Sequence, residues 1–278
     1  MEAVNIANLS LIALGQQTIT ALTDENENAR RCNAVYETMR DTLMAKHPWN
    51  FAIKRATLVN ITTPSVDAWV TATAYVVDDV IEYESVFYIC LVAHTSDVFS
   101  VNLAAGNWVT DTDWVTATQY IVGEQVYHTG ISYTCLVAHT SGVFATDLTA
   151  VKWIVSVEPG YDFGRAYRFP TNLLRLLSLE SDDNHKVEGG YLYTSDTEAQ
   201  IKYIAQVTDP DEWSPGFVTA LAASIAAALS LAITDSRTIS SDVKAEAKEK
   251  LLSALAVDAQ GGGTPEQVKS NEWIDARS

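Results

Sequence analysis

The chain has 278 residues, of which 47% are hydrophobic and 19% are charged. This composition is typical of a folded globular protein and excludes disorder throughout. The formal net charge of −17 argues against a protein that binds nucleic acid tightly by neutralising phosphates.

Three further features bear on the compartment. Residues 1–4 lack the basic stretch of a secretory signal, so we expect folding in a reducing cytosol. With only three cysteines, a disulfide framework is not expected. The apolar stretch 217–233 is shorter than the roughly 20 residues that a bilayer span needs, which predicts no membrane anchor.

The N-terminal segment predicts two helices and a strand. Apolar residues at near-helical spacing occupy positions 4–14, and Gly15 ends this helix. A second helix is expected after the cap residue Thr23 and ends before Pro48. Residues 52–63 alternate enough to predict a strand.

A tandem repeat follows. Residues 69–108 return as 114–153 at a constant offset of 45, and 20 of the 40 pairs are identical. Each copy predicts short strands, for example at 79–83 and 86–92. Because a module of about 45 residues is small, its aromatic rings must supply much of the buried area. Residues 64–160 also hold 11 acidic residues and one basic residue, a charge balance that predicts a separate domain.

The second copy carries an ordered set of aromatic, glycine and cysteine positions: Trp114, Tyr120, Gly123, Tyr127, Gly130, Tyr133 and Cys135. This spacing resembles the small chitin- or cellulose-binding modules of bacterial chitinases. The resemblance covers both copies and implies a compact three-stranded module that stacks sugar rings on exposed aromatics. Val92-Ala93 and Val137-Ala138 stand where those modules usually carry paired tryptophans. The remaining candidates for a carbohydrate-stacking role are Trp69, Phe99, Trp114 and Phe144.

The repeat also duplicates a Cys-x3-His spacing. Cys90, His94, Cys135 and His139 together offer four ligands of the types that zinc accepts, so a shared metal site is one hypothesis. The alternative is that both cysteines are small buried hydrophobes and both histidines have satisfied hydrogen bonds. No cofactor is expected.

Catalysis lacks a sequence signature. Nucleophile-elbow, zinc-protease, P-loop and dinucleotide-binding motifs are all absent from the sequence. Acidic residues at 78, 79, 82, 84 and 124 offer pairs for a glycosidase, and the alternative is a solvated charged face. We therefore predict that the chain is not an enzyme.

The C-terminal segment predicts strands at 187–193 and 200–207, followed by two helices. The first helix follows Asp209 and buries the face formed by Phe217, Leu221, Ile225 and Leu229. The second is capped by Ser240 and runs to about Asp258, with Glu246 and Lys250 at i,i+4 spacing. In the tail after residue 260, Trp273 and Ile274 are candidate contacts with a partner.

The flanks share a second resemblance. Its signatures, in order, are Leu14-Gly15, Ala29-Arg30-Arg31-Cys32, His47-Pro48-Trp49-Asn50-Phe51-Ala52, Tyr167-Arg168-Phe169-Pro170, Val187-Glu188-Gly189, Tyr203 and an Ala-rich helix pair. This order is similar to the tail tubular protein A family, the head-to-tail adaptors of short-tailed bacteriophages. The resemblance implies a virion protein of the viral tail, made in the host cytoplasm. Twelve copies would form a ring between the portal protein and the tail nozzle protein, lining a channel for passing DNA.

Together these features predict an α+β chain, mainly a helical bundle with a small antiparallel sheet, interrupted by two small all-β modules. The expected domains are 1–63 plus 161–260 as a discontinuous adaptor domain, 64–112 and 113–160 as inserted modules for surface-glycan or capsid contact, and 261–278 as a flexible tail. The favoured function is a head-tail connector. The alternatives are a carbohydrate-binding protein and a cell-wall glycan hydrolase.

Overall fold

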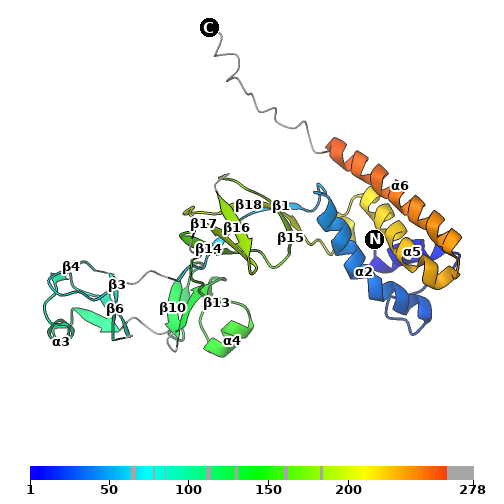
Figure 1. Cartoon of the computed structure of the whole chain (residues 1–278). Coiled ribbons are helices and arrows are strands. Elements are labelled where there is room, and N and C mark those ends of the chain that lie inside the picture. The colour runs from blue at the N-terminus through cyan, green and yellow to red at the C-terminus, as the bar shows by residue number, and fades with distance from the viewer. Residues whose placement is uncertain are drawn as a thin grey trace, which may run out of the picture. The chain divides into compact units, whose positions relative to one another are not determined.

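The structure, a computed structural model, describes residues 1–63, 67–77, 79–84, 86–110, 114–128, 131–159, 162–181 and 184–261. It divides into two units, and Figure 1 labels many of their elements. Unit 1 comprises Met1–Arg55, Thr171–Ser178 and the chain from Lys202 onward, and unit 2 comprises Ala56–Pro170 and Leu179–Ile201.

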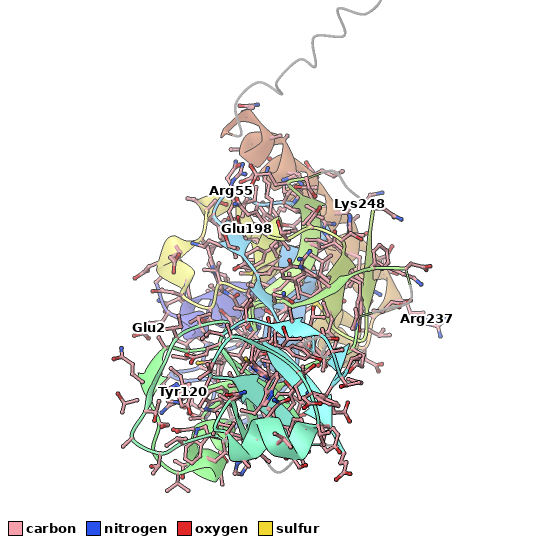
Figure 2. The ribbon with its side chains drawn as sticks, turned by 90° about the vertical axis from the view of Figure 1, so that its left-hand side faces the viewer. Glu2, Arg55, Tyr120, Glu198, Arg237 and Lys248 are labelled. Carbon is pink, nitrogen blue, oxygen red and sulfur yellow. The ribbon has the colours of Figure 1, made fainter. Side chains whose placement is uncertain are left out.

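Unit 1 contains the long helices. They are α1 (Ala3–Ala13), α2 (Glu27–Lys46), α5 (Pro215–Thr234) and α6 (Arg237–Gly261), with a short 3-10 turn, η1 (Pro210–Glu212). Asn26 caps α2 by accepting a hydrogen bond from the Ala29 backbone N–H at 2.8 Å. Ser214 caps α5, where Pro215 occupies a first-turn position that needs no N–H donor. Arg237 and Lys248 lie at exposed positions of α6 (Figure 2).

Helix α5 is the centre of unit 1, because it contacts α1, α2 and α6. The predicted face of Phe217, Leu221, Ile225 and Leu229 is buried as expected. Close packing against α6 is possible because Gly216 has no side chain: a Cβ there would lie 3.2 Å from the Ala254 Cβ. The same core takes in Ile6 and Leu11 of α1 together with Cys32 and Met44 of α2, so both ends of the chain share one hydrophobic interior.

Helix α5 is also, among the described helices, the one with the length and apolar composition of a membrane span. We expected this segment to be too short. Its composition has a simpler cause, since 56% of its most apolar stretch is buried inside the protein.

A three-stranded sheet lies mostly in unit 1. Its strands are β1 (Ile53–Thr57), β15 (Leu173–Leu179) and β18 (Gln200–Ala205), in the order β1-β18-β15. The predicted strand at 52–63 is in fact two strands, β1 and β2 (Val59–Asn60), which belong to different sheets. The sequence did not predict β15, whose leucines come in pairs separated by Arg175 and Ser178 and do not alternate with polar residues.

Unit 2 contains a four-stranded sheet and the two copies of the repeat. The sheet has the order β16-β17-β14-β2, formed by β14 (Arg165–Arg168), β16 (His185–Glu188) and β17 (Tyr191–Thr194) beside β2. Strands β16 and β17 form a hairpin whose turn, Gly189-Gly190, has φ of +58° and +87°. Positive φ favours glycine, which explains this pair.

The first module (residues 67–110) and the second module (residues 114–157) repeat the same elements. The first has β3 (Asp67–Ala68), β4 (Ala74–Tyr75), β5 (Val80–Tyr83), β6 (Val86–Cys90), β7 (His94–Thr95), α3 (Phe99–Ala104) and β8 (Trp108–Thr110). The second has β9 (Gln119–Tyr120), β10 (Gln125–His128), β11 (Ile131–Cys135), β12 (His139–Thr140), α4 (Phe144–Thr149) and β13 (Trp153–Val155). In both, three antiparallel strands (β5-β6-β8 or β10-β11-β13) are accompanied by a small strand pair, and in the first module β3 adds a fourth strand, parallel to β5.

The predicted fold class is wrong. Of the described residues 37% are helical and 27% lie in strands, with many small antiparallel sheets, so this is not mainly a helical bundle. Two misjudgements caused the error. The strand content of the flanks was underestimated at β15, and the modules are not all-β, because each contains a short helix, α3 or α4. The four-part domain division stays a prediction.

Candidate functional site

Each module is built around one phenylalanine. Phe99 lies 5.6 Å from Trp69, 4.0 Å from Tyr83 and 4.8 Å from Tyr88, measured between ring centroids. Only 3% of Phe99 and 7% of the equivalent Phe144 is exposed. These two predicted stacking residues are therefore the centres of the module cores.

The other two predicted stacking residues lie at the edge of these cores. Trp69 and Trp114 are half-buried, and Trp114 packs edge-on against Phe144 at 5.4 Å. Both indole N–H groups are buried and donate no hydrogen bond within the described residues. The accessible part of each indole is consequently its carbon surface, which suits stacking against the apolar face of a sugar ring.

The loop after each tryptophan is held rigidly. In the second module the Ser141 hydroxyl donates to the Val115 carbonyl at 2.6 Å and accepts from the Thr118 N–H at 3.0 Å. The Trp114 N–H donates to the Tyr127 carbonyl at 2.8 Å. Ser96 and Trp69 make the corresponding bonds in the first module. The position of each indole is thus fixed before any ligand arrives.

Among the described tryptophan, tyrosine and phenylalanine side chains of the second module, Trp114 is the half-buried one. The others are buried: Tyr120, Tyr127, Tyr133, Phe144 and Trp153. Figure 2 labels Tyr120 within this module. Val137, which stands at the position of the missing tryptophan pair, is 51% exposed. If a sugar stacks on a tryptophan, tyrosine or phenylalanine ring of this module, that ring is therefore Trp114.

The cysteine and histidine residues form two separate pairs. Cys90 Sγ lies 3.8 Å from His94 Nδ1, and Cys135 Sγ lies 3.9 Å from His139 Nδ1. In each pair the histidine Nδ1 lies 2.7 Å from a carbonyl two residues earlier, which accepts its proton. No group of three or more His, Cys, Asp or Glu in the described part of the chain is placed to hold a metal ion. Burial raises the pKa of the Cys135 thiol.

A charged cluster in the second module was not anticipated. The buried Asp147 carboxylate accepts from the Lys152 ammonium at 2.7 Å and from the Gly142 N–H at 2.9 Å, and its Oδ2 lies 3.5 Å from His139 Nε2. The hydrogen bond from Lys152, followed by that from Gly142, holds the pKa of Asp147 below its usual value. A signal was present in the sequence, because the first copy has the neutral Asn102 and Asn107 at these two positions.

Two of the acidic residues considered for catalysis have structural roles. Asp79 accepts from the Val76 N–H at 2.7 Å, and Glu124, at the equivalent position, accepts from the Ile121 N–H at 2.9 Å. Both carboxylates close the turn before a strand. Asp78 lies outside the described residues, as do the predicted partner contacts Trp273 and Ile274.

Comparison with known proteins supports one of the two resemblances. Residues 113–147 match carbohydrate-binding module family 5/12. No curated protein matches the chain. The resemblance to the tail tubular protein A family gains no support. The second module, from Trp114 into α4, is therefore similar to a carbohydrate-binding module.

Proposed function

We propose that the chain binds polysaccharide through its second module, with the carbon face of Trp114 as the stacking surface. The match of residues 113–147 to a carbohydrate-binding family carries the proposal, because the matched residues include Trp114 and strands β10 and β11. Chitin and cellulose are the ligands that the resemblance suggests. The rigid loop after Trp114 supports it, since a preformed surface loses little conformational entropy on binding.

The first module adds a second, equivalent surface. Trp69 is half-buried like Trp114, and its loop makes the same hydrogen bonds. When two binding modules are joined on one chain, the second binding event is intramolecular and overall affinity rises without new contacts. A polymer with repeating sugars offers many sites to both modules. We therefore expect bivalent binding.

Retention on insoluble chitin and on cellulose tests this function. We expect the intact chain to be retained by at least one polymer. Trp114→Ala lowers the affinity roughly tenfold, since a stacked aromatic anchor carries much of such an interface. Trp69→Ala lowers it less, and the double variant abolishes retention. Val137→Ala, an exposed apolar truncation in the same module, is the matched control and leaves retention unchanged.

Loss of folding is separated from loss of binding by a second substitution. Trp114→Phe keeps an aromatic ring against Phe144 but offers a smaller stacking area, so it weakens retention while thermal unfolding stays cooperative. The proposal is wrong if the intact chain is retained by neither polymer. It is equally wrong if Trp114→Ala with Trp69→Ala is retained as well as the intact chain.

A ring-forming head-tail connector is a second candidate. It is favoured by the hydrophobic core that α1, α2, α5 and α6 share, because the adaptor resemblance implies that both ends of the chain form one folded unit. In this function the chain would assemble with portal and tail nozzle proteins in a virion and line the path of passing DNA. Electron microscopy of the chain mixed with a portal protein tests it: rings or portal complexes support the connector, and their absence contradicts it.

A further inference from the structure

A pocket of about 500 Å³ lies in unit 2, where the second module meets strands β2 and β14. This volume is within the range of roughly 300–1,000 Å³ that is usual for ligand sites. Its walls include polar side chains from both sides and two glycines. They are Asn60, Thr62, Gly123, Gln125, Gly164 and Arg165.

The two sides of the pocket are joined by hydrogen bonds. The Thr63 N–H donates to the Val157 carbonyl at 2.9 Å, and the Val157 N–H donates to the Ile61 carbonyl at 2.7 Å. The Gln125 side-chain amide donates to the Thr62 carbonyl at 2.7 Å. This part of the second module is thereby fixed to the strand that precedes the first module, and the pocket is preformed.

The same bonds fix the orientation of two amides that line the pocket. Asn60 Oδ1 accepts from the Thr62 N–H at 3.0 Å and from the Thr62 hydroxyl at 2.6 Å. Its Nδ2 therefore remains a donor with no acceptor in the described part of the chain. Gln125 Nε2 donates to Thr62 and, at 3.2 Å, to the Thr134 hydroxyl, which leaves Oε1 as an acceptor with no described donor.

Arg165 supplies further donors. Its Nη1 donates to the Ser195 carbonyl at 3.1 Å, and the guanidinium has N–H groups left for a ligand. No acidic side chain is among the described lining residues. A side chain at Gly164 would meet no protein atom within 4 Å of its Cβ, so the space beside this residue is open.

We propose that this pocket binds a single sugar ring through its hydroxyl groups. A hydroxyl both donates and accepts, so neighbouring hydroxyls of one ring satisfy the Asn60 donor, the Gln125 acceptor and the Arg165 donors together. An apolar ligand would leave these groups unpaired, which is unfavourable. The site is separate from Trp114, and it gives the chain a means of holding a sugar by hydrogen bonds as well as by stacking.

Titration of the intact chain with glucose and with N-acetylglucosamine, followed by NMR, tests the pocket. We expect the side-chain amide signals of Asn60 and Gln125 to shift with at least one sugar. Asn60→Asp is the sharpest variant, because aspartate keeps both hydrogen bonds from Thr62, replaces the free donor with an acceptor and adds a negative charge. We expect roughly tenfold weaker binding for this variant, as for the loss of one buried hydrogen bond.

A graded series at Gly164 provides an independent test. Gly164→Ala keeps most of the open space and weakens binding slightly, whereas Gly164→Leu fills it and abolishes binding. Thermal unfolding of both variants shows whether the fold is intact. The inference is overturned if neither sugar shifts the two amide signals, or if Gly164→Leu binds as well as the parent chain.

This outcome can be distinguished from failure of polysaccharide binding. The double variant Trp114→Ala with Trp69→Ala leaves the pocket intact, so it should lose retention on the polymer and still bind the free sugar. Retention on polymer without any effect of a free sugar on Asn60 and Gln125 refutes the pocket and leaves the function of Trp114 standing. Sugar binding in the pocket without retention on either polymer refutes polysaccharide binding through Trp114 and leaves the pocket standing.

Discussion

The two modules have the same fold around the same aromatic core, but they satisfy their polar groups differently. In the first module the Trp108 indole donates to His94 Nε2 at 3.2 Å. In the second, His139 Nε2 faces the Asp147 carboxylate, and the Trp153 indole N–H has no partner among the described residues. The aromatic core therefore tolerates two arrangements of the polar layer beside it, one neutral and one charged.

A second difference concerns the sheet surface. Ser132 and Thr134 of β11 both lie within 3.0 Å of the Ser156 hydroxyl, and this network continues through Gln125 to Thr62. The first module has Phe87 and Ile89 at the positions of Ser132 and Thr134. These residues give the second module a polar side, which the hydrogen bonds to Thr62 and Thr63 attach to the rest of unit 2.

The largest expected effect comes from moving the buried acid into the first module. Asn102→Asp introduces a buried carboxylate at residue 102. Its neighbour by analogy with Lys152 is Asn107, which offers no positive charge. An uncompensated buried charge costs about 3–5 kcal/mol, so the first module should unfold at markedly lower denaturant concentration. Hydrogen exchange measured on the full chain shows whether the loss of stability is confined to the first module.

The double variant Asn102→Asp with Asn107→Lys completes this test, because it transplants the pair found at Asp147 and Lys152. It should recover most of the lost stability. If the single variant is as stable as the parent chain, or if the added lysine restores nothing, the ion pair is not what allows Asp147 to be buried.

A smaller effect is expected at Val151, the second residue after helix α4. Val151 has φ of +57°, whereas the equivalent residue of the first module is Gly106, with φ of +76°. Left-handed backbone is unfavourable for a β-branched residue by roughly 1–2 kcal/mol. Val151→Gly should therefore stabilise the second module by about this amount, and Gly106→Val should destabilise the first. If Val151→Gly and the parent chain are equally stable in chemical denaturation, the backbone at Val151 is not strained.

The smallest effect is a pH dependence confined to the second module. The pKa of Asp147 is lowered in the folded state, so its contribution to stability is present above the unfolded-state pKa of about 3.9 and is lost as the pH falls through the folded value. Hydrogen exchange between pH 5 and pH 3 should show earlier loss of protection in the second module than in the first. The Asp147→Asn variant has the same residue as the first module at this position and should remove the difference. If the difference in pH dependence persists in this variant, another group causes it.

The comparison also marks what sequence reasoning could predict. The helices were recognised because their apolar faces are local signals, as at Phe217, Leu221 and Ile225, and Gly15 marked the end of α1. The predicted starts were wrong, because Ser214 and not Asp209 caps α5, and α6 begins at Arg237, before Ser240. The repeat itself identified the module cores. The start of α2 was displaced because Asp24 binds Thr20 and Ala21 in the preceding loop, and Asn26 is the actual cap.

The site was less accessible to sequence. From sequence alone, Phe99 and Phe144 could be either exposed stacking residues or core residues, because phenylalanine serves in both places. Only the packing of their neighbours shows that they belong to the core. The pocket beside Asn60 combines residues up to 105 positions apart in the chain, from Asn60 to Arg165, so no local sequence pattern predicts it. The exchange of Asn102 and Asn107 for Asp147 and Lys152 was visible as a paired change, but its meaning depended on knowing that both side chains face each other.

The most direct measurement follows the tryptophan indole signals by NMR while a soluble chitin or cellulose oligosaccharide is added to the intact chain. Binding at the modules shifts the signals of Trp114 and Trp69 and leaves the buried Trp49 and Trp213 of unit 1 unchanged. If Trp114 does not respond while the chain binds the oligosaccharide, or if no signal responds at saturating sugar, the second module is not the carbohydrate-binding surface.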